Sequence, residues 1–371
     1  MIDDHAHPFP LEFAPLELAS ISLDARSDAA GPPRRLRAGP GRLFQEVLTG
    51  GLAHLLGCDF EEPADVVALR DAQAEKDWSA WVRRLFDDAG IDGMLLDEGV
   101  SSTNAGPVEA YSALTGRPFW RLARVDALVD ELIGAQATAS EVVAAVEDFM
   151  RAAAASGAVG FKTILAYRTG LAVDPDVSLE EAAASLAVEG GEGRPVRRRA
   201  KALRDLVTRT LLAGAADLGK PVQIHTGFGD SDIRLADADP LLLEPLLDSP
   251  AGSAATVVLI HGSYPWHEQV GYLATVRPNV YAELSLSNLF APLGVTRRLL
   301  ALVDLTPRDK LLVGSDGHGA PETHWFACRM LSAAFEELSA ELAAAGARPA
   351  WVEATRRAVF EENAREVYSL A

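Results

Sequence analysis

Histidine residues at the very start of this chain are the first side chains that could do chemistry. Residues 1–7 read MIDDHAH, a short apolar start that runs into His-x-His. Successive side chains of a strand point to opposite faces, so His5 and His7 would share a face. Two neutral imidazoles on one face can bind one ion of zinc, iron or a similar metal. A lone His-x-His is more often a chance occurrence or a solvated turn, so this assignment depends on the rest of the chain.

Three further residues of ligand type follow short apolar runs later in the sequence. His225 ends the run 221–225, His261 ends 256–261, and Asp316 ends 310–316. For each residue taken alone, the alternative to a metal ligand is a structural polar side chain that is hydrogen-bonded at a strand end. Their regular recurrence at strand ends favours a shared site over unrelated polar residues.

The elements that must position these residues are short apolar runs separated by helical patterns. With the opening strand we count eight such runs, the others being 90–97, 119–125, 158–164, 221–225, 256–261, 280–284 and 310–316. Helical patterns lie between them near 104–116, 139–156, 178–218, 240–248, 264–277 and 288–304, and two more follow at 322–345 and 349–369. Alternating strands and helices imply a parallel sheet with right-handed crossovers, and eight units predict a (β/α)8 TIM barrel. The carboxyl ends of barrel strands converge on one face, where three histidines and one aspartate would leave room for water or substrate, as in catalytic sites.

The segment 8–90 is too long for an ordinary strand-to-helix connection. It holds helical patterns at 43–57 and 62–88, and the stretch 24–41 between the first strand and these helices is rich in Arg, Pro, Gly and Asp. We interpret it as a helical insertion after strand 1, a cap or a subunit contact, within a single domain spanning 1–371. The stretch 187–200 is expected to be an exposed loop.

Composition narrows the classes of partner. The 371 residues carry a formal net charge of −19, which disfavours nucleic acid and anionic membrane surfaces. No apolar run reaches the ~18 residues needed to span a bilayer. Cys58 and Cys328 form no metal or disulfide pattern, so a reducing cytoplasm is the expected location. We expect a small-molecule substrate, and a homo-oligomer is left open.

Several of these motifs together resemble the amidohydrolase superfamily, in its amidohydrolase-related branch. The matching segments are 4–7 (DHAH), 224–225 (IH), 260–261 (IH), 314–316 (GSD) and the closing helix 362–368 (ENAREVY). The resemblance covers the chain apart from about 8–90. Within the branch, the stretch 160–171 (GFKTILAYRTGL) is similar to the amidohydrolase domain of the FluG-like group.

The resemblance implies a divalent metal ion bound by His5, His7, His225 and Asp316, with zinc expected first and manganese or iron as alternatives. It also implies that Asp316 is the general base in single-metal members. His261 would bind a second metal in some members, and substrate or the attacking water in others. A bound metal lowers the pKa of water from 15.7 toward ~7 and polarises a carbonyl.

Lys162 has two interpretations. It lies at the end of the fourth predicted strand, where two-metal members of the superfamily carry a carboxylated lysine between the metals. Otherwise it would pair with a substrate carboxylate or a nearby acid. We favour one metal ion, with two if Lys162 is carboxylated.

Six other residues are candidates for binding the substrate. Arg124 and Arg168 follow the third and fourth strands and suit a carboxylate, although a structural ion pair is an equal alternative for each. Glu283 could orient a ligand histidine, bind a substrate amine or be a structural carboxylate. His318, Tyr264 and Trp266 follow strand ends and would line the mouth or simply pack.

The leading function implied is hydrolysis of a carbon–nitrogen bond in a small carboxylate-bearing amide, with a γ-glutamyl amide suggested by the FluG-like stretch. The alternative is a metal-dependent decarboxylase or isomerase on the same scaffold. A third class is a non-catalytic binding protein that keeps the fold. In that case the predicted metal ligands would have no catalytic role.

Overall fold

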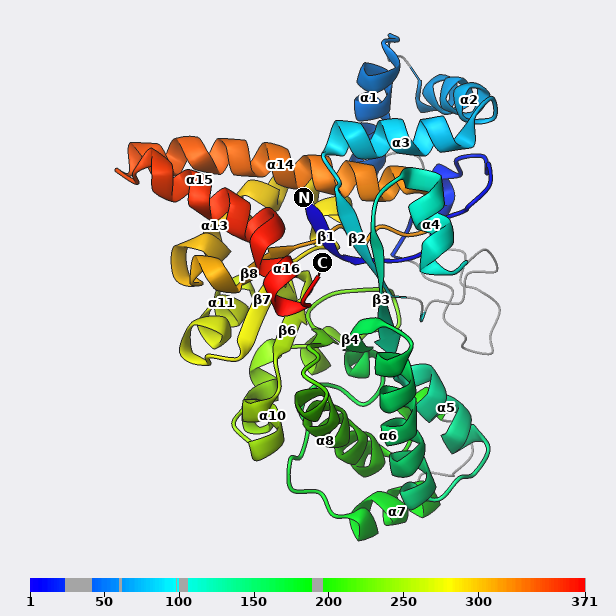
Figure 1. The fold of residues 1–371 in the computed structure, drawn as a ribbon, viewed down its shortest axis with the longest axis vertical. Coiled ribbons are helices and arrows are strands. Elements are labelled where there is room, and N and C mark those ends of the chain that lie inside the picture. The colour runs from blue at the N-terminus through cyan, green and yellow to red at the C-terminus, as the bar shows by residue number, and fades with distance from the viewer. Residues whose placement is uncertain (24–41, 60–61, 98, 100–105, 189–195, 371) are drawn as a thin grey trace.

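Eight parallel strands form a barrel in strict sequence order, as predicted. The computed structural model describes residues 1–23, 42–59, 62–97, 99, 106–188 and 196–370. Each strand pairs with the next along the chain (Figure 1). The strands are β1 (Ile2–Ala6), β2 (Gly93–Asp97), β3 (Phe119–Arg124), β4 (Ala158–Thr163), β5 (Val222–His225), β6 (Val257–Ile260), β7 (Val280–Leu284) and β8 (Leu311–Val313).

The barrel closes where the end of β8 meets β1. The backbone N–H of Asp316 donates to the carbonyl of His5 at 2.8 Å, and that of His7 donates to the carbonyl of Gly317 at 2.9 Å. The first strand is therefore held on both sides, by β2 and by the segment after β8.

The strands form because they can be buried on both faces. Every residue of β2, β4, β5, β6 and β8 is buried, which explains their continuous apolar runs. Inside the barrel, Ile2, Leu95, Leu122 and Val258 are among the residues of one apolar cluster with Tyr368 from the C-terminal segment. A larger apolar layer separates the strands from the surrounding helices.

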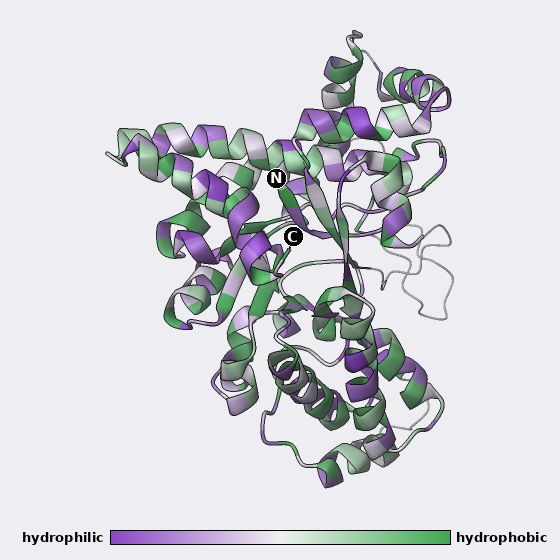
Figure 2. Cartoon of the chain, viewed as in Figure 1, coloured by the Kyte–Doolittle hydropathy of each residue, from purple (hydrophilic) through white to green (hydrophobic). Residues whose placement is uncertain are grey.

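Helices surround the sheet on its outer side (Figure 1). They are α4 (Val108–Thr115), α5 (Asp126–Gly134), α6 (Ala139–Ala155), α7 (Leu179–Val188), α8 (Lys201–Asp217), α9 (Glu244–Leu247), α10 (Pro250–Ala254), α11 (His267–Val276), α12 (Ser287–Phe290), α13 (Val295–Leu305), α14 (Pro321–Ala344), α15 (Pro349–Arg357) and α16 (Asn363–Val367). Figure 2 shows hydrophobic and hydrophilic residues alternating along these helices, as expected when one face packs on the barrel. No helix within the described ranges is long and apolar enough to cross a membrane.

The described part of the segment after β1 contains the α-helices α1 (Leu43–Leu56), α2 (Pro63–Ala74) and α3 (Trp78–Ala89). The single helical pattern expected at 62–88 is divided in two. Asp77 begins a new helix because its side chain accepts a hydrogen bond from the N–H of Ala80 at 2.9 Å. The helix α3 packs against α14, as a barrel helix would, while α1 and α2 lie beyond it (Figure 1). The loop expected at 24–41 and residues 189–195 of the one expected at 187–200 lie outside the described residues.

Candidate metal centre

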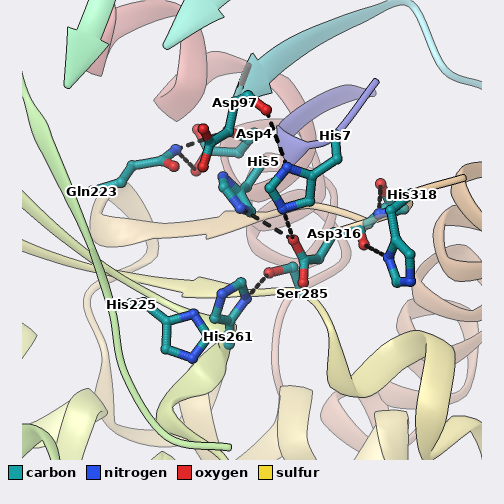
Figure 3. A network of polar contacts seen from close by, with 12 residues as sticks. Asp4, His5, His7, Asp97, Gln223, His225, His261, Ser285, Asp316 and His318 are labelled. Carbon is teal, nitrogen blue, oxygen red and sulfur yellow. Dashed lines mark hydrogen bonds and ion pairs between the residues drawn. The ribbon is translucent and has the colours of Figure 1, made fainter. Parts of the chain in front are cut away.

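The closure of the barrel brings the first and last predicted ligands together. The Nε2 atoms of His5 and His7 each lie 3.1 Å from the same oxygen, Oδ1 of Asp316 (Figure 3). His5 is 1% exposed and Asp316 is 6% exposed, so these groups meet away from bulk water. Two imidazoles at the end of β1 and a carboxylate from the segment after β8 therefore converge on one point.

His261 completes this cluster more closely than His225 does. Single ligand atoms of His5, His261 and Asp316 lie within 4.8 Å of one another. The His225 ring lies beside His261, with centroids 4.4 Å apart, but its Nε2 is 3.1 Å from the carbonyl oxygen of Phe228. In this arrangement His225 belongs to the site, while that nitrogen faces the backbone. Its role as a metal ligand stays a prediction.

The protonation states suit a cation. Burial lowers the pKa of His5 to about 4, and lowers the pKa of His225 and of His261 well below the usual value. Burial would raise the pKa of Asp316, but His261 and the approach of His5 and His7 hold it well below the ordinary range. His7 differs, because the effect of Asp316 outweighs burial and raises its pKa. The neutral imidazoles of His5, His225 and His261 and the ionised carboxylate of Asp316 are the forms that bind metal.

Unpartnered atoms support the same conclusion. Oδ1 of Asp316 is buried and receives no hydrogen bond from any described residue, although two imidazole nitrogens approach it. Buried polar atoms are normally paired, and a shared cation would supply the partner. The residues present therefore fit a divalent metal ion.

Asp97 is a site residue that the sequence analysis did not single out. It ends β2, and single ligand atoms of His5, His7 and Asp97 lie within 4.8 Å of one another. Asp97 ends an apolar run, as Asp316 does, and this position in the sequence would have been enough to select it as a candidate. The Nε of Arg124 lies 3.0 Å from both Asp97 oxygens, and its Nη2 also donates to Oδ2. The predicted carboxylate-binding Arg124 is thus already paired with an acid of the protein.

Lys162 and Arg168 have different surroundings. Lys162 is 1% exposed at the end of β4, and its Nζ has no hydrogen-bond partner in the described part of the chain. Burial lowers its pKa to about 8. Arg168 instead forms an ion pair with Asp130 of α5 at 2.9 Å, where Arg204 also binds. Within the described residues, Lys162 is thus a buried cation of the site whose ammonium forms no hydrogen bond.

Glu283 lies at the back of the cluster. Its Oε2 accepts a hydrogen bond from the backbone N–H of His261 at 2.9 Å and one from the hydroxyl of Ser285 at 2.8 Å. It is fully buried and contacts the backbone of a site histidine, and its role stays a prediction.

Residues of the loops after β5, β6 and β8 surround the cluster. Gly227 has a φ of 72°, and a Cβ there would lie 2.5 Å from the backbone of Ser263, so only glycine lets these loops meet. The Tyr264 ring lies 4.9 Å from that of Phe228.

The remaining candidates are Trp266 and His318. The half-buried Trp266 immediately precedes α11. His318 has its Nδ1 3.1 Å from the carbonyl oxygen of Asp316. Tyr167, which the sequence analysis did not name individually, lies 4.6 Å from the His225 ring and accepts a hydrogen bond from the N–H of Asp230.

Comparisons with known proteins agree with this geometry. The amidohydrolase family model matches residues 2–370. Protein FluG of Emericella nidulans is 30% identical over 370 residues, which cover 91% of this chain and 42% of FluG. The chain therefore spans less than half the length of that relative.

Two solved structures have a similar fold. A Lactobacillus casei protein described as a metal-dependent hydrolase is similar over 100% of this chain and 95% of its own, with a TM-score of 0.85 and 25% identity. Uronate isomerase from Thermotoga maritima covers 87% of this chain and 78% of its own, with a TM-score of 0.66 and 14% identity, and so shares the fold.

Proposed function

Because this chain belongs to the amidohydrolase family, we propose that it is a metal-dependent hydrolase that cleaves the carbon–nitrogen bond of a small amide. The observation that carries this proposal is the convergence of His5 and His7 on one oxygen of Asp316. We propose a γ-glutamyl amide as the substrate class, supported by the 30% identity to FluG over most of the chain.

His5, His7, His225 and Asp316 would hold one divalent ion, with zinc as the first expectation and manganese or iron as alternatives. His261, whose ligand atom lies within 4.8 Å of those of His5 and Asp316, is an additional donor. When bound, the ion would polarise the amide carbonyl and acidify the attacking water.

Asp316 is proposed as the general base. The low pKa of its carboxylate keeps it ionised near neutral pH and able to accept a proton from water. As the water oxygen bonds to the carbonyl carbon and the carbon–nitrogen bond breaks, the same proton would pass to the leaving nitrogen. The products are a carboxylic acid and an amine.

Lys162 is proposed to bind the carboxylate of the substrate. Its ammonium is buried without a partner in the described part of the chain, which is costly unless an anion joins it. With a pKa of about 8 it is mostly protonated at pH 7. Arg124 lies opposite Lys162 in the register of β3 and β4, but its charge is balanced by Asp97.

The helices after β1 are proposed to cap the carboxyl face of the barrel. The ring of Phe44 in α1 lies 5.2 Å from that of Phe290, which ends α12 after β7. Arg70 of α2 binds Glu322 at the start of α14, after β8, at 2.6 Å. Both contacts are made with segments that follow strand ends.

The test is release of amine from a panel of γ-glutamyl amides by Zn²⁺-loaded protein and by the same protein after chelation. We expect turnover by the loaded protein, and its loss in His5→Gln but not in the exposed control His54→Gln. Carbon dioxide release without amine would favour a decarboxylase, and interconversion of isomers without amine would favour an isomerase. No metal-dependent turnover on any amide would contradict the proposed substrate class.

A further inference from the structure

His261, Ser285 and Glu283 form a buried chain of hydrogen bonds behind the candidate metal centre. The Nδ1 atom of His261 lies 2.7 Å from the hydroxyl oxygen of Ser285, and that hydroxyl lies 2.8 Å from Oε2 of Glu283 (Figure 3 draws the first contact). His261 is 1% exposed, while Ser285 and Glu283 are fully buried. Water therefore does not compete for these contacts.

The direction of each hydrogen bond follows from the number of protons available. Oε2 of Glu283 accepts from the backbone N–H of His261 at 2.9 Å, and its second donor is Ser285. The other oxygen, Oε1, has no partner within the described residues, so a proton on that carboxyl group would reside there and leave Oε2 an acceptor. Ser285 has a single hydroxyl proton, which is committed to Glu283. The remaining contact requires His261 to donate from Nδ1.

We propose that Ser285 is a positioning residue that, anchored by Glu283, fixes His261 in the tautomer protonated on Nδ1. The other ring nitrogen, Nε2, then carries a lone pair for the site. His261 thus acts as a ligand to a cation or as an acceptor for a proton of the attacking water, and not as a donor.

The hydrogen bond to Ser285 matters because the carboxylate of Asp316 is a second possible acceptor for the proton of His261. A ligand atom of His261 lies within 4.8 Å of those of His5 and Asp316. Without Ser285, the ionised carboxylate of Asp316 would favour the opposite tautomer, with N–H on Nε2 directed into the site. That tautomer cannot donate a lone pair from Nε2 to a metal ion.

The decisive experiment reads the tautomer directly, by long-range ¹H–¹⁵N spectra of full-length protein labelled with ¹⁵N-histidine. Spectra are recorded with Zn²⁺ and after removal of the ion with a chelator. We expect His261 to keep its proton on Nδ1 in both states. In Ser285→Ala the chelated protein should show the proton on Nε2 or exchange between the two nitrogens, and its Zn²⁺ affinity should fall about 10–100-fold. Ser285→Thr keeps the hydroxyl and should restore both.

Ser287→Ala is the matched control. Ser287 is fully buried two residues further along, and its hydroxyl has no hydrogen-bond partner in the described part of the chain. A proton on Nε2 of His261 in the unsubstituted, chelated protein would overturn the proposal, as would Ser285→Ala that matches Ser287→Ala in both tautomer and affinity. Should Ser285→Ala fail to fold, the spectrum of the unsubstituted protein and that of Ser285→Thr still decide.

The affinity measurement rests on the proposed metal-dependent function, whereas the tautomer does not. Protein that binds no Zn²⁺ yet keeps His261 protonated on Nδ1 would contradict the function and leave the role of Ser285 standing.

Discussion

Asp316 and His5 are joined twice, once through the backbone and once through their side chains. The N–H of Asp316 donates to the carbonyl of His5 at 2.8 Å, and the Asp316 carboxylate lies 3.1 Å from the His5 imidazole. The first contact closes the barrel between its last and first strands. The second forms the centre of the candidate metal site. The same pair of residues therefore closes the barrel and contributes to the site.

Metal binding should therefore stabilise the fold. An ion that binds only the native state adds about 2.7 kcal/mol at a concentration of 100 Kd. We expect Zn²⁺ to raise the thermal midpoint of the protein in calorimetry, and His5→Gln to lose most of that increase. The exposed histidine of α1 provides the control His54→Gln, which should respond as the unsubstituted protein does. An equal increase in His5→Gln would show that Zn²⁺ stabilises the protein from another site.

Asp316→Asn should remove the general base while keeping the side-chain shape. The expected loss in kcat is about 10²–10⁴-fold, the usual contribution of a positioned proton acceptor. Steady-state kinetics on the best amide of the panel would measure it, with Asp309→Asn, an exposed change just before β8, as the control. Retention of kcat within a few-fold in Asp316→Asn would exclude Asp316 as the base.

Lys162→Met should have opposite effects on stability and on substrate binding. It removes a buried ammonium that has no partner in the described residues, so the unliganded protein should be as stable as before or more stable. It should also raise KM for an amide with a carboxylate more than for the matched neutral amide. Denaturant unfolding and kinetics on the two substrates would test both. Equal increases in KM for the two substrates would mean that Lys162 does not bind the carboxylate.

His324 should make the fold sensitive to acid. Burial, followed by the charges of His318 and His7, lowers the pKa of its imidazole to about 3, against 6.5 for an ordinary histidine. Since the unfolded chain takes up the proton first, stability is complete above pH 6.5 and falls as the pH decreases toward 3. The slope for one such group is about 1.4 kcal/mol per pH unit.

The measurement is urea unfolding between pH 7 and 4. His324→Gln should lower stability at pH 7 by loss of packing, yet show a shallower decline with acid than the unsubstituted protein. His54→Gln, at an exposed position, should leave the decline unchanged. Parallel curves for His324→Gln and the unsubstituted protein would show that the acid sensitivity comes from other groups.

The sequence by itself determined the barrel and the family. Strands buried on both faces are mainly apolar, so seven internal runs stood out with their positions nearly correct. A polar residue at the end of such a run differs from its apolar neighbours, which is why His225, His261 and Asp316 could be selected as site candidates without coordinates. The motif at 4–7 then linked the start of the chain to the same face.

Helix boundaries were less accessible because they depend on single caps. At the break between α2 and α3, Asp77 is extended and its side chain caps α3. The helix α5 was missed: it has nine residues and its first turn has no side-chain cap, so its start carries no sequence signal.

Only the tertiary structure decided which side chains pair. Arg124 of β3 binds Asp97 of the neighbouring strand β2, and Arg168 binds Asp130 of α5. The ammonium of Lys162 has no hydrogen-bond partner among the described residues. Ser285 gained its role from lying beside His261, a residue 24 positions away in the chain. The residue types show which groups can form ion pairs and hydrogen bonds, but the pairs that form are set by strand register and by packing at distances of about 3 Å, which the order of residues does not encode locally.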